Sequence, residues 1–294
     1  MKNAIFAGVC TVDQQYLVDK YPAENEKINA LQVAQASGGP ATNAAFAFSL
    51  LGGKARLTSL IGKHPFTDFV LNELEKHQIT LSDVDPEREW PFIVSSIITS
   101  SETGSRNVFS YKPRINCSLP ENTDILKDAE ILLIDGFYPE MAKELARHAK
   151  ENNIPVVFDG GSWKEKTEEI LPLVDFAICS SSFFPPGTSN TNEIFDYLQN
   201  MRVKYSALTN GENPILYQTP EIKGSLNVKK LNDPVDTLGA GDFFHGAFCY
   251  YLDASNNFIE ALNKASDVAG FSCGYFGTRT WMKYFNTYLH AKRG

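Results

Sequence analysis

Three aspartates surround a glycine-rich turn near the C-terminal end of the sequence. Asp233, Asp236 and Asp242 lie within ten residues, and Gly239-Ala240-Gly241 stands directly before an apolar run with helical periodicity. A glycine turn at a helix start leaves backbone N–H groups unpaired and points them at a ligand. The pattern therefore predicts an anion hole suited to a phosphate group, with Asp242 beside it in the first helical turn.

Asp242 is the predicted catalytic base of a phosphoryl transfer. The helix dipole stabilises a carboxylate in this position, so we expect it to be ionised at neutral pH and only modestly basic. Phosphoryl transfer needs no stronger base, because positioning and charge stabilisation supply most of the catalysis. The alternative is a tight turn in which Asp242 only caps the helix. Repulsion among the three aspartates counts against this alternative, because a cation or a structural bond must offset it.

A pair of glycines in the N-terminal part of the sequence indicates a second ligand-binding segment. It reads Ser37-Gly38-Gly39-Pro40-Ala41-Thr42-Asn43 and leads into a predicted helix. Paired glycines followed by a short polar side chain expose backbone amides and the Asn43 amide to a polyhydroxyl ligand. Asp13 directly follows residues 5–12, which read as a first buried strand, and open α/β sheets bind ligands at the ends of such strands. A loop, a helix cap and an exposed carboxylate explain the same residues when each is taken alone.

Strands and helices alternate along the rest of the chain. Short apolar runs rich in β-branched residues predict buried strands at residues 4–9, 56–61, 131–134, 155–158, 176–179 and 205–209. Helical periodicity predicts helices at residues 42–51, 66–77, 139–152, 193–200, 242–252 and 258–272. This alternation indicates an α/β fold with a mostly parallel sheet flanked by helices.

Two segments, residues 14–36 and 92–112, interrupt this alternation with consecutive extended stretches. In the second, 92–99 and 106–111 flank a glycine-containing turn and predict a hairpin. We therefore predict one domain over residues 1–294 with a small β-sheet inserted in it. Such a sheet serves as a lid that excludes water from a reactive phosphoryl group, or as an edge for a homodimer.

Composition excludes several classes of partner. The net charge is -8, and the 27 lysines and arginines are scattered, so the sequence offers no basic stripe for a nucleic-acid backbone. No window reaches the roughly 18 apolar residues that a membrane span needs. The five cysteines are widely spaced and form no C-x-x-C pair, which is typical of a reduced, cytoplasmic protein.

Together, the two glycine segments resemble the signatures of the ribokinase-like, or PfkB-type, carbohydrate kinase family. The N-terminal signature is similar to Gly38–Ala45 followed by Gly52 and Gly62, and the C-terminal one to Asp236–Asp242 followed by Gly246-Ala247. Further segments are most similar to the ketohexokinase and sulfofructose kinase branches of the family: Val235-Asp236-Thr237, Thr103-Gly104-Ser105-Arg106, and Val268-Ala269-Gly270 with Cys273-Gly274.

The resemblance implies a Rossmann-like, three-layer core with a β-sheet lid, and transfer of the γ-phosphoryl group of ATP, with Mg²⁺, to a sugar hydroxyl. Asp242 would be the base, beside the anion hole of Gly239, Ala240 and Gly241. The implied substrate-binding residues are Asp13, Gly38, Gly39, Asn43, Arg106 and Asp242. The implied nucleotide-binding residues are Thr209, Gly211, Gly239, Gly241, Gly270, Cys273 and Gly274. A monovalent cation such as K⁺ would lie near Asp236.

One element of the family pattern is missing. The family often has an Asn-x-x-Glu element that assists Mg²⁺, whereas this chain reads Ser180-Ser181-Ser182-Phe183-Phe184-Pro185-Pro186 there. The metal environment is therefore open, and so is a catalytically silent sugar- or nucleotide-binding regulator. A nucleoside kinase of the same family is a further alternative, because Tyr16, Phe92 and Phe109 offer rings for a stacked base. The sequence leaves the sugar and its reacting hydroxyl open.

Overall fold

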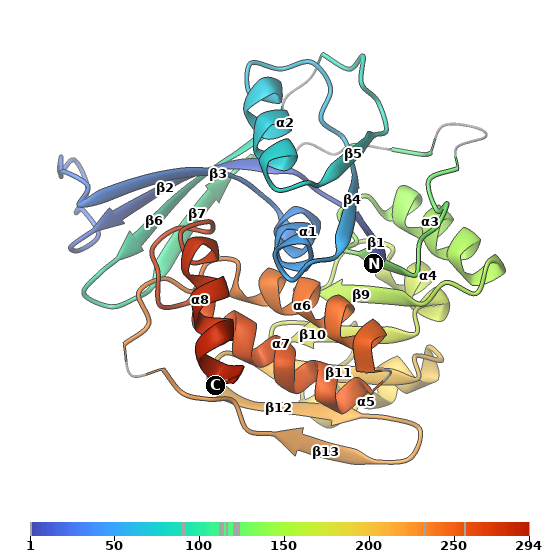
Figure 1. The fold of residues 1–294 in the computed structure, drawn as a ribbon. Helices are drawn as coiled ribbons and strands as arrows, with labels where there is room; N and C mark the ends of the chain where they lie inside the picture. Colours follow the sequence, from blue (N-terminus) through green and yellow to red (C-terminus); the bar gives the residue numbers. More distant parts are fainter. Residues whose placement is uncertain are drawn as a thin grey trace.

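A large, mostly parallel sheet runs through the middle of the molecule (Figure 1). The computed structural model describes residues 2–89, 92–111, 115, 117–119, 124–231, 233–255 and 257–293. Lys112, the last residue of the predicted lid segment, lies outside them. The strand order is β13 (Lys223–Leu226), β12 (Asn213–Gln218), β11 (Tyr205–Asn210), β10 (Phe176–Ser180), β9 (Val156–Gly160), β8 (Ile131–Ile134), β1 (Asn3–Ala7), β4 (Lys54–Ser59) and β5 (Thr80–Asp83).

Within this sheet, the strands β11, β10, β9, β8, β1, β4 and β5 pair in parallel with their neighbours. Strands β12 and β13 add an antiparallel hairpin at the β11 edge. All four residues of β8 are buried, as a strand covered on both faces requires. Successive side chains of a strand point to opposite faces. Phe6 of β1 therefore joins one hydrophobic core, while Ile5 and Ala7 join the other.

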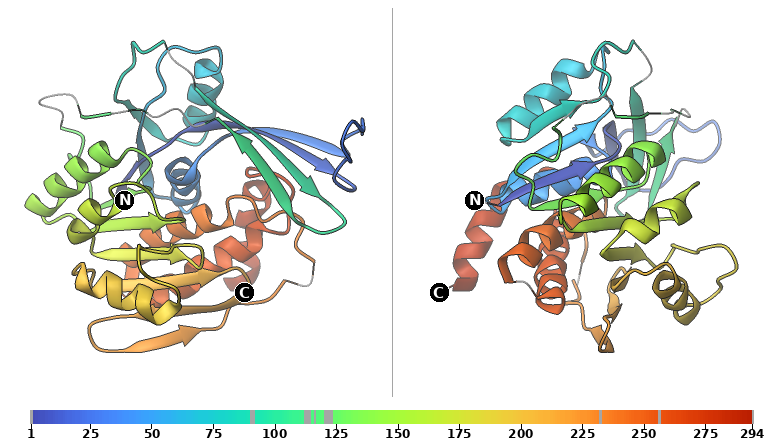
Figure 2. Two further views of the ribbon diagram at one scale, coloured as in Figure 1. Left: turned by 180° about the vertical axis from the view of Figure 1, so that it is seen from behind. Right: turned by 90° about the vertical axis from the view of Figure 1, so that its right-hand side faces the viewer.

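Helices cover both faces of the sheet, which gives the predicted three layers (Figure 2). One core is formed with α1 (Pro40–Leu50), α2 (Thr67–Lys76), α6 (Ala240–Ser255), α7 (Phe258–Ser272) and α8 (Met282–Arg293). The other is formed with α3 (Pro139–Glu151), α4 (Thr167–Ile170), a 3-10 turn (Leu171–Leu173) and α5 (Thr191–Asn200). No helix among the described residues combines the length and apolar character needed to cross a membrane.

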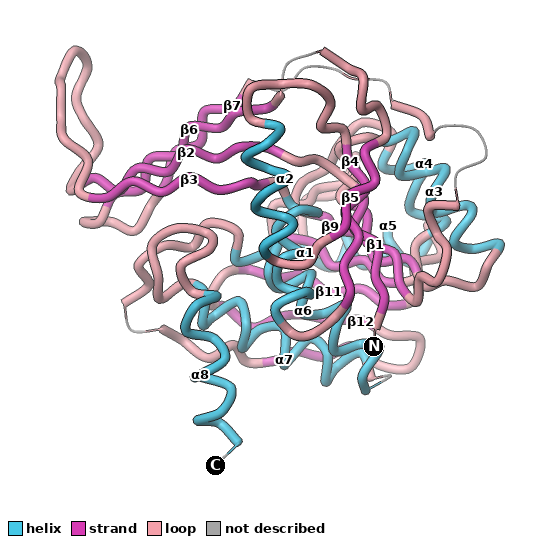
Figure 3. Tube along the Cα trace, turned by 45° about the horizontal axis from the view of Figure 1, so that its top comes forward, coloured by secondary structure: helices cyan, strands magenta, loops and turns pink. Residues whose placement is uncertain are grey.

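A second, four-stranded sheet projects from the core and forms the predicted lid (Figure 3). Its order is β3 (Gln32–Gly38), β2 (Thr11–Val18), β6 (Ile93–Ser100) and β7 (Arg106–Ser110). The predicted hairpin is the antiparallel pair of β6 and β7. Strand β2 follows β1 after only three residues, and β3 leads through Gly39 directly into α1. The second of these connections runs through the predicted substrate segment, and Asp13 lies near the start of β2, just after the first.

Candidate active site

Helices α1 and α6 approach each other closely, and this contact joins the two glycine segments. A Cβ atom added to Gly246 of α6 would lie 2.0 Å from the backbone oxygen of Ala44 in α1, so only glycine permits this approach. As a result, Asn43 Nδ2 donates a hydrogen bond of 2.8 Å to Asp242 Oδ2, although the residues lie 199 positions apart. The predicted base and a predicted substrate-binding residue are thus in direct contact.

Asp242 lies at the meeting point of several charged groups and is only partly exposed. Removal from water, followed by the nearby Asp159 carboxylate, raises the pKa of Asp242 to about 7, while the Asn43 hydrogen bond and His245 act in the opposite direction. The expectation of an ionised and only modestly basic carboxylate took no account of this burial or of Asp159, both of which favour the protonated form. A pKa near the working pH makes this carboxylate a better general base than expected.

The turn before α6 has the geometry of an anion hole. Gly239 has a φ of +74°, a left-handed conformation that favours glycine, and its oxygen accepts the first helical hydrogen bond from Phe243 N at 2.8 Å. The backbone N–H groups of Gly241 and Asp242 fall in the first turn, where a helix has no acceptors for them. A Cβ added to Gly241 would meet nothing within 4 Å, so the space in front of the turn is open.

His245 fastens this turn to the central sheet. Its Nδ1 lies 2.7 Å from Gly241 O, and its Nε2 lies 3.0 Å from Ile178 O in β10. The same Nδ1 is 3.3 Å from Asp159 Oδ2, an oxygen that has no hydrogen-bond partner among the described residues. The anion hole is therefore supported from behind by a buried histidine and a buried carboxylate.

A cavity of about 480 Å³ opens beside the anion hole. Five of the predicted nucleotide-binding residues line it, whereas Gly239 and Gly274 do not: the lining five are Thr209, Gly211, Gly241, Gly270 and Cys273. Apolar side chains complete one wall, which suits a flat ring system: Ile215, Val228, Leu231, Phe244 and Ala269. Arg106 reaches the cavity from the lid, and its guanidinium donates to the hydroxyl of Thr237.

Apart from Arg106, which lies at the nucleotide cavity, the predicted substrate residues meet where the lid joins the core. Asp13 of β2 is buried, which raises its pKa, and it accepts a hydrogen bond of 2.8 Å from Thr11 Oγ1. A Cβ added to Gly38 would lie 2.0 Å from Asp13 Oδ2, so the carboxylate packs directly on the glycine backbone. A Cβ added to Gly39 would lie 2.3 Å from Val9 O, so this glycine also has no room for a side chain.

The predicted cation site at Asp236 is a buried carboxylate that accepts two amide hydrogen bonds. Leu238 N donates to Oδ1 at 2.9 Å, and Gly277 N donates to Oδ2 at 3.0 Å. Each oxygen keeps a second lone pair, which fits a cation held mainly by other oxygens. No cluster of three or more His, Cys, Asp or Glu side chains with a metal-binding arrangement occurs in the described part of the chain.

Three residues that the sequence did not single out support the site: Glu73, Asp135 and Arg279. Asp135 accepts hydrogen bonds from Val9 N, Phe137 N and Ala41 N at 2.9, 3.0 and 3.3 Å, and burial raises its pKa to about 6. Asp135 directly follows the buried strand β8, so a search for carboxylates after apolar runs could have found it. Asp13 was expected to end the first strand, but it lies inside lid strand β2, because β1 ends at Ala7. Glu73 and Arg279 form an ion pair across 206 positions, for which the sequence has no local signal.

Serines occupy the position of the missing Asn-x-x-Glu element. Ser180 Oγ accepts from Ser182 N at 3.1 Å, and Ser181 Oγ donates to Asn210 Oδ1 at 3.1 Å. Ser180 and Ser181 both line the cavity. The described residues at this end of β10 therefore offer hydroxyl groups, and not a carboxylate, to a nucleotide or its metal ion.

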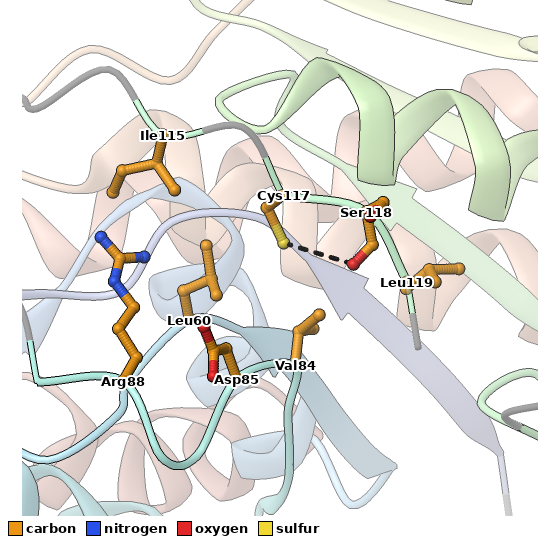
Figure 4. Close-up of a pocket in the computed structure, with 8 residues that line it drawn as sticks. All are labelled: Leu60, Val84, Asp85, Arg88, Ile115, Cys117, Ser118 and Leu119. Atoms are coloured by element: carbon orange, nitrogen blue, oxygen red, sulfur yellow. Dashed lines mark hydrogen bonds between the residues drawn. The ribbon is translucent and has the colours of Figure 1, made fainter. Parts of the chain in front are cut away.

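A second hollow of about 480 Å³ lies beyond the ends of β4 and β5 (Figure 4). It contains none of the predicted site residues; its lining is Leu60, Val84, Asp85, Arg88, Ile115, Cys117, Ser118 and Leu119. The thiol of Cys117 contacts the backbone oxygen of Ser118 at 3.9 Å. The candidate site is therefore the region between the lid, α1 and α6.

Comparison with known proteins agrees with this arrangement. Residues 1–283 match the sequence pattern described as pfkB family carbohydrate kinase. The chain is 25% identical over 292 residues to the ketohexokinase of Mus musculus, with 94% of this chain and 97% of the relative covered. The fold is similar to that of a ribokinase from Thermotoga maritima, with a TM-score of 0.81, 22% identity and coverage of 98% and 99%.

A further similar structure is Arabidopsis thaliana ribokinase complexed with ribose and ATP. Its TM-score is 0.74 and its identity 17%, with 96% of this chain and 97% of that chain covered. The fold predicted from the sequence, an α/β core with a β-sheet lid, is confirmed by these structures.

Proposed function

Because the chain belongs to the pfkB family of carbohydrate kinases, we propose that it transfers the γ-phosphoryl group of ATP to a sugar hydroxyl, with Asp242 as general base. The observation that carries the proposal is the hydrogen bond between Asn43 and Asp242. It joins the sugar-binding and phosphate-binding segments beside an open anion hole. Sugar and phosphate would therefore meet at Asp242.

Each group in the site has a role in this reaction. Asp242 accepts the proton of the attacking hydroxyl, while the amides of the Gly239–Gly241 turn stabilise negative charge on the transferred group. Asp13, Asn43 and the Gly38-Gly39 backbone hold the other sugar hydroxyls. A bound Mg²⁺ would neutralise phosphate charge and would be held mainly through the phosphate oxygens and water. The Asp236 carboxylate would assist a monovalent cation such as K⁺.

The nucleotide would occupy the cavity beside the turn. Its apolar wall suits the adenine ring, and the first-turn amides of α6 face the phosphate end. Arg106 connects the lid to the Thr237 loop, so closing of the lid would bring a positive charge toward the transferred group. Closure would also exclude water and limit hydrolysis of ATP.

A sugar is better supported than a nucleoside. Phe92, one of three rings that were candidates for stacking on a base, is buried in the core and packs against His64 with ring centroids 5.9 Å apart. The similarity to a ketohexokinase favours a ketose or a related sugar as the acceptor. The ribose and ATP in the similar Arabidopsis structure support a sugar and ATP as the two ligands.

The test is ADP release with ATP, Mg²⁺ and a panel of ketoses, aldoses, sulfosugars and nucleosides. We expect turnover with a sugar, and a fall in kcat of roughly 10²–10⁴-fold in the Asp242→Asn variant with ATP affinity nearly unchanged. Asp233→Asn, which changes an exposed aspartate of the same segment, is the matched control. Turnover of nucleosides alone would show that the acceptor is a nucleoside and not a sugar. Saturable binding of a sugar or nucleotide without turnover would indicate a regulator. Normal turnover in Asp242→Asn would show that Asp242 is not the general base.

We also propose a homodimer formed through the lid. Its two edge strands, β3 and β7, carry apolar side chains that are more than half exposed: Val33, Val108 and Phe109. Edge strands with such side chains are ready for pairing with a second copy. Sedimentation at micromolar concentration should show a dimer that Val33→Asp with Phe109→Asp converts to a monomer. A wild-type monomer would contradict the dimer.

A cytoplasmic location is part of the proposal. It is supported by five free, buried thiols, none of which is in a disulfide bond. Fractionation of cells that express the chain should recover it in the cytosol, and recovery with secreted proteins would contradict this location.

A further inference from the structure

A buried arginine from the C-terminal segment lies directly behind the contact between Asn43 and Asp242. Arg279 Nη1 donates to Asn43 Oδ1 at 2.9 Å, and its side chain is only 14% exposed. The guanidinium carbon lies 3.6 Å from the ring centroid of Phe46, one turn further along α1. Arg279 is therefore held over α1 at the level of the site.

The chemistry of the guanidinium fixes which way the Asn43 amide points. An amide side chain has one accepting oxygen and one donating nitrogen, and a guanidinium has only donors. Because Arg279 faces one end of the amide, that end must be the oxygen. The nitrogen of Asn43 then faces Asp242 Oδ2, where it donates to the carboxylate. Without Arg279 the amide could turn over whenever Asp242 is protonated, and its oxygen would then accept from the carboxyl O–H.

Arg279 is itself held by an ion pair and by the lid. Its Nε donates to Glu73 Oε1 at 3.0 Å, and its Nη2 donates to Ser37 O at 2.5 Å. Glu73 Oε2 in turn accepts from Ser37 N at 2.6 Å and from Ser37 Oγ at 2.7 Å. The pair therefore connects α2, the end of lid strand β3 and the start of α1 at one point.

We propose that Arg279 is a positioning residue for the catalytic base, acting through the orientation of the Asn43 amide. The inference rests on the proposed role of Asp242. Arg279 is not among the residues lining the nucleotide cavity, so its effect falls on the chemical step and not on ATP binding. Glu73 keeps the guanidinium in place and balances its buried charge.

Other charged groups also face Asp242 and set the background for this effect. They are Asp159 from β9, Asp13 from lid strand β2, and His245 from α6 itself. The two aspartates favour the protonated form of Asp242, and His245 and the donated Asn43 hydrogen bond favour the ionised form. Removal of the Asn43 donor should therefore make Asp242 harder to ionise.

The test compares Arg279→Met, Arg279→Lys and the double variant Glu73→Gln with Arg279→Met. We expect Arg279→Met to lower kcat by roughly 100-fold, as a misplaced catalytic group does, with the KM for ATP within about twofold of wild type. The pH at which kcat reaches half its maximum should rise by about one unit, because the carboxylate has lost a donor. Arg279→Lys keeps the charge without the guanidinium fork and should lie in between.

The double variant separates positioning from stability. It removes both buried charges, so we expect it to recover the folding stability lost in Arg279→Met but not the kcat or the pH midpoint. Arg147→Gln, which removes an exposed arginine on α3, is the control for loss of charge and should behave as wild type. Recovery of kcat in the double variant, or an unshifted pH midpoint in Arg279→Met, would overturn the inference. Full activity of Asp242→Asn would instead overturn the proposed base.

Discussion

The packing of α1 on α6 offers a sharp test of how the site is held together. Replacement of Gly246 by alanine places a Cβ atom 2.0 Å from Ala44 O, a rigid backbone atom in the middle of a helix. The helices must move apart by about 1 Å before the contact becomes tolerable. The hydrogen bond between Asn43 and Asp242, now 2.8 Å, would then exceed the usual limit of about 3.5 Å.

Stability and catalysis should both fall in Gly246→Ala. Overpacking of a core typically costs about 1–3 kcal/mol, and the better helix propensity of alanine returns up to about 1 kcal/mol. A net loss of about 1–2 kcal/mol lowers Tm by about 2–5 °C in a protein of this size. A displacement of about 1 Å at the base lowers kcat by roughly 100-fold.

Thermal unfolding and steady-state kinetics measure the two effects. Gly270→Ala is the matched control for stability, because it is also a glycine in a helix and its added Cβ would meet nothing within 4 Å. We expect this control to be as stable as wild type or slightly more stable. Wild-type Tm and kcat in Gly246→Ala would show that the two helices are not in close contact and would refute the reasoning.

Three further predictions follow from the site and from the buried thiols. With saturating substrates, kcat should rise with pH through about 7 as Asp242 ionises, since its raised pKa leaves it protonated below that pH; a flat profile between pH 5.5 and 8.5 would contradict this. Gly241→Ala should unfold at the wild-type temperature but raise the KM for ATP at least tenfold, because its Cβ enters the open anion hole. Burial raises the pKa of Cys10 to about 12 and of Cys117 to about 11, so a thiol reagent at pH 8 should label them only after urea is added.

The sequence predicted the central architecture well because buried parallel strands and amphipathic helices have strong periodic signals. Strand β8 and helix α7 have the predicted boundaries, and the other predicted elements differ by a few residues at their ends. Strands β5, β12 and β13 were not predicted because they are short or alternate in burial at the edge of the sheet. Helix α8 was not predicted because its polar composition hides the apolar face that packs on α7.

The site was predictable in its glycine turns but not in its electrostatics. Gly38, Gly239 and Gly246 stand where backbone geometry demands glycine, so their positions are visible in the sequence. The pKa of Asp242 is raised by burial and by Asp159, a residue 83 positions away that only folding brings near. Glu73 and Arg279 likewise form an ion pair between residues far apart in the sequence, which only folding brings together.

The order of strands also determines when the site can form during folding. Strand β1 is an inner strand of the sheet, between β8 and β4. Its residue Ala4 pairs with Ile131, more than a hundred residues later, and contacts between such distant residues slow folding. Asn43 gains its partner Asp242 only when α6, from the last fifth of the chain, docks on α1. A ribosome-bound chain that ends before α6 can build most of the sheet but has no base. Enzyme activity should therefore return last on refolding, after the far-UV signal of the sheet and helices.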